Sequence, residues 1–451
     1  MKSTTTNGHL NVTPEGLPKR TGNNLDPWYH HYAARAAGLS ASEVRALFAV
    51  ASRPEVVSLA GGMPFVSALP DEFVMGSLER VMRERGPVAL QYGSGQGTES
   101  IREHILEIMA IEGIEATLDN VVVTTGSQQA LDLVAKLFLD PGDVVLAEAP
   151  SYVGAIGVFR SYEADTVHMA VDEHGLIPAA LQETIDRLRA EGRRIKLLYT
   201  IPNFQNPSGV TMSAERRAEV LRICRANEIL VVEDNPYGLL WFESPAPNAI
   251  RSLDEDGVIY LGSFSKTLAP GFRVGWALAP HAIREKLILA NESAILSPSV
   301  FSQMVIAEYL DQVDWRTQID TFRGLYRERK EAMLEALDDH LPELRWTNPD
   351  GGFFVWLDLP PELDSKAMLP RAVRELVAYT PGTAFFDDGG GRHNIRLSFC
   401  YPTPESIRLG VRRLANVVGG ELDLLTTFAG TGSLALEDRV RRTSTPPSNL
   451  A

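Results

Sequence analysis

Cysteine is scarce in this chain. The 451 residues include only two cysteines, Cys224 and Cys400, and neither belongs to a Cys-x-x-Cys pair or to a cysteine–histidine cluster with the spacing of metal ligands. Two cysteines cannot build the framework of several disulfides that stabilises small secreted domains. The sequence therefore favours a protein of a reducing compartment, and we predict no metal site.

Basic residues are too few to outweigh the acidic ones. The chain has 43 lysines and arginines against 58 aspartates and glutamates, which gives a formal net charge of −15. A protein that binds nucleic acid generally needs a basic surface to neutralise phosphates, so we expect no nucleic-acid partner. A local cationic pocket for a small anion is still compatible with this balance.

Long apolar runs are also absent from the sequence. The longest fall far short of the ~20 residues that cross a bilayer as a helix. The first residues, MKSTTTNGHLNVTPEG, contain no apolar core of a signal peptide. We therefore predict a soluble, cytoplasmic protein that does not associate with a membrane.

The two ends of the chain differ in composition from its middle. Residues 1–26 are rich in Thr, Asn, Gly and Pro, and we predict a flexible tail there. The sequence from Gly430 onward, GTGSLALEDRVRRTSTPPSNLA, has the same character, so residues 421–451 are predicted to be a largely disordered C-terminal extension. Hydrophobic residues make up 44% of the whole chain, which is enough for the segment between these ends to form a core.

Apolar runs alternate with amphipathic stretches through the middle of the chain. Short runs of aliphatic and β-branched residues indicate strands at 121–124 (VVVT), 144–147 (VVLA), 196–200 (KLLYT), 229–232 (ILVV) and 258–262 (VIYLG). Helical patterns such as 126–138 and 213–227 lie between them. This alternation predicts an α/β fold with a mostly parallel, doubly wound sheet whose strands are buried on both faces.

The pattern changes from about residue 315. We expect helices at 316–340, 365–378 and 404–418, and strands at 351–359 and 394–399. This part is interpreted as a smaller α+β domain at 315–420, which follows a large domain at 76–314. Residues 27–75, which include VVSLAGGMP, are predicted to pack with the small domain.

Chemically useful side chains follow each predicted strand. The five strand ends lead to a Gly-Ser-Gln turn into a helix (126–128), an aromatic residue (Tyr152), an amide (Asn206), a carboxylate with a phenol (Asp234 and Tyr237) and a lysine (Lys266). In doubly wound sheets, ligands bind just beyond the carboxyl ends of the strands. We therefore expect one composite site at this edge of the sheet.

This set meets the needs of pyridoxal 5'-phosphate (PLP), a cofactor whose ring stabilises a carbanion at the α-carbon of an amino acid. Lys266 can form a Schiff base and shuttle a proton, Asp234 can pair with the ring nitrogen, and Tyr152 can lie on the ring face. Asn206 and Tyr237 are candidate donors to the ring oxygen.

The phosphate and carboxylate groups have candidates of their own. A helix N-terminus, hydroxyl groups and an arginine suit a phosphate. The candidates are Ser127, Gln128, Ser263, Ser265 and Arg273. Arg396, in NIRLSF, is the candidate for the α-carboxylate of a substrate.

Each of these residues, taken alone, has a simpler interpretation. An isolated lysine is usually solvated, an Asn-Pro-Ser-Gly sequence is usually a turn, and a single arginine often forms a structural ion pair. GSFSKT lacks the GxxxxGK of a P-loop, and YGSGQG is not the GxGxxG of a dinucleotide-binding fold. Their common position at strand ends is what favours the cofactor site.

Three motifs carry a family resemblance. NFQNPSG (203–209), DNPYG (234–238) and SFSKTLAPGFRVGW (263–276) resemble fold-type I PLP-dependent aminotransferases of class I/II. In detail they are similar to the subgroup of 2-aminoadipate, kynurenine and multi-substrate aminotransferases. The motifs occur in the family order, with Asn206 28 residues before Asp234 and Asp234 32 residues before Lys266. The resemblance extends from about residue 40 to residue 420.

The resemblance implies a function and a set of roles. The enzyme would move the α-amino group of an L-amino acid to a 2-oxo acid through aldimine and ketimine intermediates, with Lys266 as the catalytic lysine that carries PLP. The implied cofactor-binding residues are Tyr92, Ser127, Gln128, Tyr152, Asn206, Asp234, Tyr237, Ser263, Ser265, Lys266 and Arg273, and the implied substrate-binding residues are Gly62 and Arg396. Tyr92, in LQYGSGQG, matches a family tyrosine that reaches the phosphate of the neighbouring subunit, which implies a homodimer.

Other functions remain open on the same motifs. A PLP-dependent amino-acid oxidase, β-lyase or decarboxylase would use the same scaffold, because motifs that hold the cofactor do not fix the reaction. Some transcription regulators carry this domain, without catalysis, behind a winged helix-turn-helix, but only about 40 residues precede the fold here. Members that accept a distal carboxylate can place an arginine just before the stretch that corresponds to ASEVR (41–45). Position 38 is glycine in this chain, so the resemblance does not imply a substrate with a distal carboxylate. Arg35, three residues earlier, is the arginine that could take this role.

Overall fold

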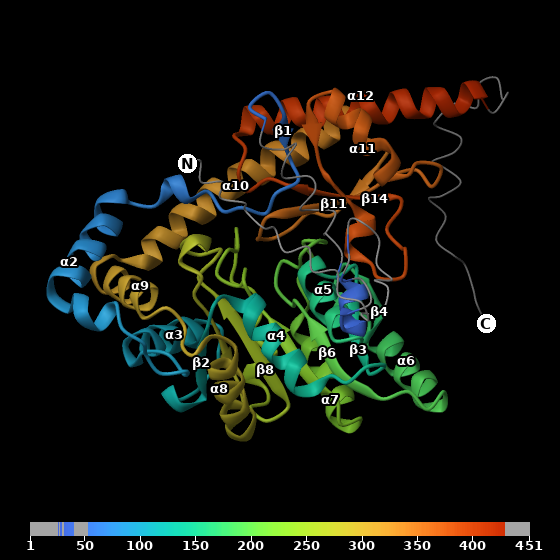
Figure 1. Cartoon of the computed structure of the whole chain (residues 1–451). Coiled ribbons are helices and arrows are strands. Elements are labelled where there is room, and N and C mark those ends of the chain that lie inside the picture. Colours follow the sequence, from blue (N-terminus) through green and yellow to red (C-terminus); the bar gives the residue numbers. More distant parts are fainter. Residues whose placement is uncertain (1–25, 27, 29–30, 40–52, 429–451) are drawn as a thin grey trace, which may run out of the picture.

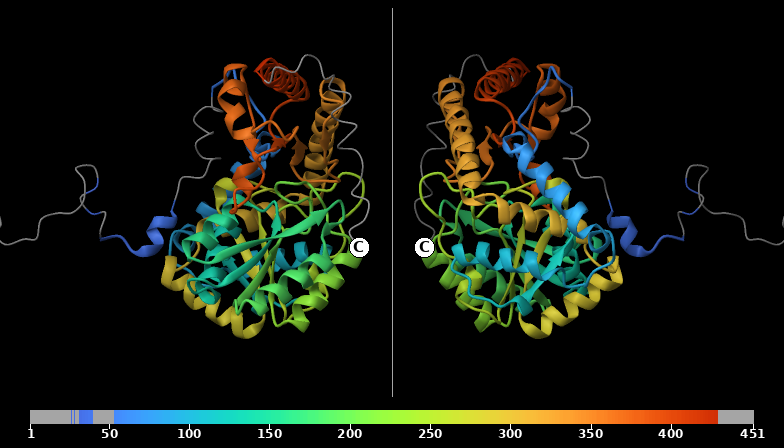
Figure 2. Two further views of the ribbon diagram at one scale, coloured as in Figure 1. Left: turned by 90° about the vertical axis from the view of Figure 1, so that its right-hand side faces the viewer. Right: turned by 90° about the vertical axis from the view of Figure 1, so that its left-hand side faces the viewer.

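A computed structural model describes residues 26, 28, 31–39 and 53–428. Two bodies are stacked on one another in all three views, a lower body built on a sheet of eight strands and an upper body built on a sheet of four (Figures 1 and 2). Apart from residue 26, the predicted flexible tail lies outside the described residues, as do residues 429–451 of the predicted extension.

The large sheet is mostly parallel. Its strand order is β2-β9-β8-β7-β6-β3-β4-β5, with parallel pairs from β8 to β4 and with β9 antiparallel to both of its neighbours. The bounds are β2 Val121–Thr124, β3 Val144–Ala149, β4 Asp165–Asp172, β5 Gly175–Leu176, β6 Ile195–Thr200, β7 Leu230–Asp234, β8 Val258–Ser263 and β9 Gly275–Leu278. The predicted α/β class is confirmed, and each of the five predicted strands is present. Strands β4, β5 and β9 were not predicted. Strand β4 is half-exposed and interrupted by polar residues, β5 has only two residues, and β9 (GWAL) contains no β-branched residue.

Helices cover both faces of this sheet, as the doubly wound prediction requires. Alternate residues of each strand point to opposite faces. One face packs against α4 Ser127–Phe138, α5 Val153–Ser161 and α8 His281–Ile295, and the opposite face against α6 Pro178–Ala190 and α7 Ala214–Ala226. Two further helices, α3 Glu99–Ile111 and α9 Val300–Gln312, pack together near β2. The strand ends therefore emerge at one edge, between helix layers that hold them in place.

The small body is built on an antiparallel sheet with the order β10-β11-β14-β13. Its elements are α10 Trp315–His340, β10 Arg345–Trp346, β11 Phe354–Asp358, α11 Ser365–Arg374, β12 Val377–Ala378, β13 Thr380–Pro381, β14 Asn394–Ser398 and α12 Pro404–Phe428. The helix predicted for 365–378 ends early, because Leu376 has a φ of +58° and the residues after it join a strand pair. Helix α12 continues to Phe428, so residues 421–428 are helical, contrary to the predicted disorder; Leu422 packs on the core there.

The described part of the N-terminal segment divides between the two bodies. Strand β1 Val57–Ser58 pairs in parallel with β12 in the small body, and helix α2 Asp71–Ala89 packs against α9. The short helix Ala34–Gly38 lies beside α5 of the large body (Figure 1). Residues 40–52, between these parts, lie outside the described residues, and the domain boundaries stay a prediction.

No helix in the described ranges is both long and apolar enough to cross a membrane.

Candidate active site

Lys266 lies in the turn that follows β8, at the carboxyl end of the parallel strands. Its Nζ donates a hydrogen bond to the carbonyl oxygen of Gly62 at 2.8 Å, so the N-terminal segment contacts the lysine directly. Burial lowers the pKa of Lys266 to about 8, because an ammonium group loses its hydration there. The neutral, nucleophilic form of this amine is therefore accessible near physiological pH.

Asp234 ends strand β7 and is buried. Its Oδ2 accepts a hydrogen bond from the hydroxyl of Tyr199 at 2.8 Å, whereas its Oδ1 is buried and has no partner among the described residues. Burial raises the pKa of Asp234 to about 6, while the Tyr199 hydrogen bond and the charge of Lys266 lower it. Buried acceptors without a donor are rare, and a protonated ring nitrogen would satisfy this one. The residue thus fits the cofactor that the sequence indicates.

Arg396, on β14, is buried where the small body meets the large one. Its Nη1 donates to Oδ1 of Asn206 at 2.8 Å and its Nη2 to the carbonyl oxygen of Ala60 at 2.6 Å, while its Nε has no acceptor within the described part of the chain. The guanidinium lies over the rings of Phe354 and Phe385, at 4.2 and 4.9 Å from their centroids. Burial lowers the pKa of Arg396 to about 10. These neighbours are all neutral, so a bound anion would compensate the buried charge.

Helix α4 begins at Ser127, directly after Gly126, whose φ of +81° lies in the left-handed region. Arg273 lies against this turn, with its Nη2 donating to the carbonyl oxygen of Thr125 at 3.2 Å. The positive φ of Gly126 is what requires glycine in this turn, and a Cβ there would come within 2.5 Å of the same nitrogen, which shows how closely Arg273 approaches the turn. Free N–H groups at a helix N-terminus beside an arginine favour a phosphate.

Two serines connect the lysine turn to this anion site. Ser263 ends β8, and its Oγ accepts a hydrogen bond from the backbone N–H of Ser265 at 3.0 Å, with the two hydroxyl oxygens 2.8 Å apart. Ser263 pairs in the sheet with Gly275, where an added Cβ would lie 2.5 Å from the backbone nitrogen of Ser127. The structure thus brings Ser127, Ser263, Ser265 and Arg273 to one place.

Gln128 and Tyr152 lie on the same side of the site. Gln128 Nε2 donates to the carbonyl oxygen of Gly154 at 3.0 Å. A Cβ on Gly154 would come within 2.6 Å of both the Tyr152 ring and Gln128 Oε1, so the two side chains share one wall. Burial, followed by the nearby charge of Asp234, raises the pKa of Tyr152 to about 12. Tyr152 follows β3 and Asp234 ends β7, so both residues belong to the same edge of the sheet.

Tyr237 is buried three residues after Asp234, with its ring edge-on to Phe353 and Phe354 at centroid distances of 5.3 and 6.0 Å. Burial raises the pKa of the Tyr237 hydroxyl, which therefore stays protonated and able to donate. The two phenylalanines, with Tyr199 and Phe385, were missed by the sequence reasoning. A hydroxyl inside the apolar strand KLLYT was the available signal for Tyr199, whereas GGFFVW indicated a strand without indicating what it contacts.

Tyr92 stands apart from the other predicted site residues. It follows α2, and 76% of its surface is exposed. Its backbone N–H donates to Oε1 of Gln91 at 2.9 Å, and no hydrogen bond among the described residues joins its hydroxyl to the site. A single chain therefore leaves this side chain facing outward.

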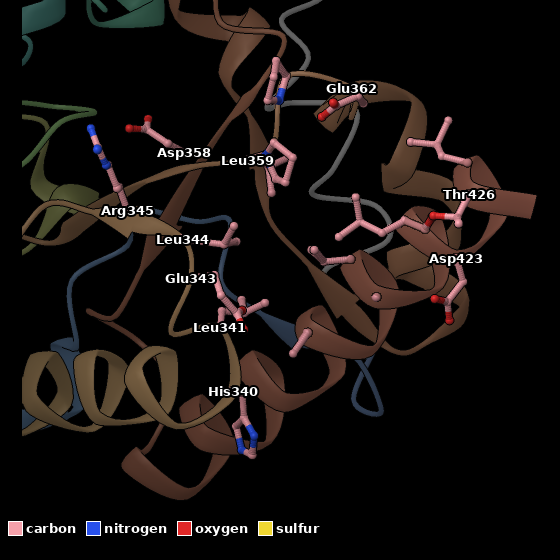
Figure 3. Close-up of a pocket in the computed structure, with 17 residues that line it drawn as sticks. His340, Leu341, Glu343, Leu344, Arg345, Asp358, Leu359, Glu362, Asp423 and Thr426 are labelled. Atoms are coloured by element: carbon pink, nitrogen blue, oxygen red, sulfur yellow. The ribbon is translucent and has the colours of Figure 1, made fainter. Parts of the chain in front are cut away.

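A separate cavity of about 440 Å³ lies in the small body. Figure 3 shows residues around it from the end of α10, the end of β11 and α12, including Leu341, Leu359 and Asp423. None of the predicted site residues lines this cavity. We therefore assign it no part in the chemistry at the strand ends.

Residues 64–414 match the family model of aminotransferase class I and II. The aromatic-amino-acid aminotransferase 1 of Thermococcus litoralis is 40% identical over 396 residues, which cover 87% of this chain and 95% of the relative. The 2-aminoadipate transaminase of Thermus thermophilus is 40% identical over 403 residues, which cover 88% and 99%. Among solved structures, the kynurenine aminotransferase of Pyrococcus horikoshii, solved with PMP, superposes with a TM-score of 0.84 at 39% identity and covers 88% of this chain and 99% of its own.

Proposed function

We propose that this chain, which belongs to the aminotransferase class I and II family, holds its cofactor on Lys266 and binds the α-carboxylate of its substrate through Arg396. The family resemblance of the sequence is confirmed, and the protein is a PLP-dependent aminotransferase that moves an amino group from an amino acid to a 2-oxo acid. The observation that supports the residue assignments is Oδ1 of Asp234, which is buried and has no hydrogen-bond partner among the described residues.

The remaining roles follow from the donors and acceptors in the site. Asp234 would accept from the protonated ring nitrogen, while Tyr237 and the amide N–H groups of Asn206 would donate to the ring oxygen. The phosphate would be held by Ser127, Gln128, Ser263, Ser265 and Arg273. When bound, PLP supplies an electron sink for the carbanion at the substrate α-carbon. Lys266, with a pKa of about 8, suits the removal and return of the α-proton, because a base works best when its pKa lies near the working pH.

The substrate is proposed from the relatives and from the surroundings of Arg396. The relatives are named for aromatic amino acids, 2-aminoadipate and kynurenine. Phe354 and Phe385 are buried against the guanidinium of Arg396, so the residue assigned to the α-carboxylate has aromatic surroundings. We therefore propose an aromatic L-amino acid or kynurenine as amino donor. Gly62 would lie beside this substrate, since its carbonyl oxygen contacts the Lys266 amine.

A panel of amino acids tests both the donor and the reaction. The visible absorbance of the purified holoprotein should bleach with aromatic amino acids and return when a 2-oxo acid is added. Oxygen consumption without an acceptor would instead support the oxidase alternative, and release of carbon dioxide would support the decarboxylase. Absence of bound PLP at saturating cofactor would contradict the whole assignment.

We also propose a cytoplasmic location, supported by two buried and unbridged cysteines.

Replacement of Arg396 with lysine should raise the KM for amino-acid donors and lower kcat/KM by about 10- to 100-fold, the equivalent of one or two charge-assisted hydrogen bonds. A lysine cannot reproduce the two-nitrogen contact with a carboxylate. Steady-state kinetics would measure the loss, with the absorbance of the bound cofactor as a check on the site. Arg251→Lys is the matched control, because Arg251 is also buried but lies on the short helix Ile250–Ser252, away from the site. Equal effects of the two substitutions would contradict the carboxylate role.

We propose that two copies of the chain form a homodimer in which Tyr92 reaches the phosphate of the partner's site. The 76% exposure of Tyr92 supports this, since an exposed side chain is accessible to a second copy of the chain. A heterodimer of one Lys266→Ala chain and one Tyr92→Ala chain, purified by two different tags, should then be more active than either variant homodimer. One of its two sites would combine an intact lysine with an intact tyrosine from the other chain. Activity no higher than that of the Tyr92→Ala homodimer would place the tyrosine in its own site.

A further inference from the structure

The loop NFQN (203–206) leaves strand β6 and is fixed through its amide side chains. Gln205 Nε2 donates to Oε2 of Glu148 at 3.0 Å, and Asn206 Oδ1 accepts from Arg396 at 2.8 Å. The first amide of the loop, Asn203, has neither of these partners. It connects instead to the neighbouring loop, which follows β7.

Asn203 and Asn235 form a hydrogen bond between these two loops, here termed the amide bridge. Asn203 Nδ2 donates to Asn235 Oδ1 at 3.1 Å. At one end of the bridge, Arg217 Nη2 donates to Asn203 Oδ1. At the other end, Asn235 Nδ2 donates to Oε2 of Glu112 at 2.9 Å, and the Tyr260 hydroxyl donates to the same oxygen. These hydrogen bonds connect side chains of α7, of the loops after β6 and β7, of the residue that follows α3 and of β8 in one network.

The amide bridge is buried and its ends are fixed. Asn203 is 1% exposed, Asn235 5% and Arg217 1%, so water cannot replace a broken bond. Arg217 also donates to the backbone carbonyl oxygens of Met212 and Pro247, each at 3.0 Å. At the other end, burial raises the pKa of Glu112 to about 8. An arginine clamped by the backbone and a largely neutral acid therefore hold the two amides in one geometry.

The bridge lies immediately beside the residues assigned to the cofactor ring. Asn203 precedes Asn206 by three residues, and Asn235 lies between Asp234 and Tyr237. We propose that the amide bridge is a positioning contact that sets the spacing between Asn206 and Tyr237, and through it the hydrogen bonding of the cofactor's ring oxygen. This rests on the proposed function, because Asn206 and Tyr237 are assigned to that oxygen there.

Asn235→Ala tests the proposal through the ionisation of the bound cofactor. Loss of the bridge lets the two donors separate, so the ring oxygen becomes more basic and the proton that it shares with the Schiff-base nitrogen leaves at higher pH. We expect the pH midpoint of the visible absorbance change to rise by about half a unit to one unit. Asn203→Ala should give a similar rise, and the double variant should add little, because both substitutions remove the same hydrogen bond.

Two further variants separate positioning from general stability. Asn227→Ala removes another buried amide, which accepts from Arg189 at 2.6 Å after the end of α7, and should lower the melting temperature without moving the absorbance midpoint. Glu112→Gln keeps the acceptor oxygen of the bridge, so its midpoint should equal that of the wild type. If Asn235→Ala does not fold, Asn203→Ser, which shortens the donor side chain, takes its place.

The outcomes are distinct. An unchanged midpoint in folded bridge variants that still bind the cofactor would overturn the positioning role, even with a lowered melting temperature. A shift of the same size in Asn227→Ala would overturn it as well. A wild-type protein that binds no PLP would contradict the proposed function itself, before any variant is compared.

Discussion

Replacing Lys266 with alanine is expected to prevent covalent attachment of the cofactor and to lower the transamination rate by about 10⁴-fold, the upper range for loss of a general acid–base group. Burial lowers the pKa of the Lys266 amine to about 8, so the neutral, reactive form is present near physiological pH. Alanine would remove both the amine proposed to bind PLP and the base proposed to move the α-proton. Borohydride reduction followed by peptide mass analysis would show the cofactor on Lys266 in the wild type and on no peptide of the variant.

The matched control is Lys286→Ala. Lys286 is an exposed lysine on α8, so its loss should change neither attachment nor rate. Borohydride-reducible cofactor on another lysine of the Lys266→Ala protein, together with a normal rate, would contradict the assignment. Partial recovery of the Lys266→Ala rate by a small added amine would support the proton-transfer role.

Replacing Asp234 with asparagine is expected to lower kcat by about 10²- to 10³-fold, the loss typical for one preorganised electrostatic contact in an active site. Oδ2 of the carboxylate accepts from the Tyr199 hydroxyl, and Oδ1, which has no donor within the described ranges, could accept from a protonated ring nitrogen. Asparagine would keep the shape of the side chain but remove the charge that is proposed to keep this nitrogen protonated. Single-turnover bleaching with an amino acid would measure the loss directly.

The pH dependence of cofactor affinity gives a second measurement on the same variant. The pKa of Asp234 is raised to about 6 by burial, so the carboxylate becomes protonated as the pH falls through that value and loses its attraction for the ring. Affinity for PLP should therefore weaken below about pH 6 in the wild type, and the difference between wild type and Asp234→Asn should shrink there. Asp143→Asn is the control. Asp143 is also buried, but it pairs with Arg194. It directly precedes β3 and therefore lies at the opposite end of the strands from Asp234. A constant difference across the pH range would contradict the pairing of Asp234 with the ring nitrogen.

Much of the site followed from local sequence patterns. Short apolar runs placed β6, β7 and β8, and the residues after them, including Asn206, Asp234 and Lys266, were recognisable because parallel strands deliver their ends to one edge. The glycine before Ser127 likewise indicated a helix N-terminus. Such signals arise within a few residues, so no knowledge of distant contacts was needed.

Supporting residues were harder to find. Tyr199 looks like an ordinary strand residue, and its role depends on β6 and β7 being neighbours, so that its hydroxyl meets Asp234. Asn203 and Asn235 look like turn residues, and the bridge exists only because the two loops lie side by side. The early end of α11 depends in the same way on the pairing of β12 with β1, more than 300 residues away in the sequence.

The sequence by itself determined the family and five strands of the large sheet, because short motifs and short apolar runs are local signals. The same motifs supplied the candidate lysine, aspartate and phosphate-site residues. Only the tertiary structure decided that Arg396 contacts Asn206 across 190 residues and that Lys266 donates a hydrogen bond to Gly62 across 204. It also left one oxygen of Asp234 without a partner among the described residues. Those features depend on which surfaces pack together and which polar atoms are left unpaired once water is excluded, and a local pattern carries no information about either.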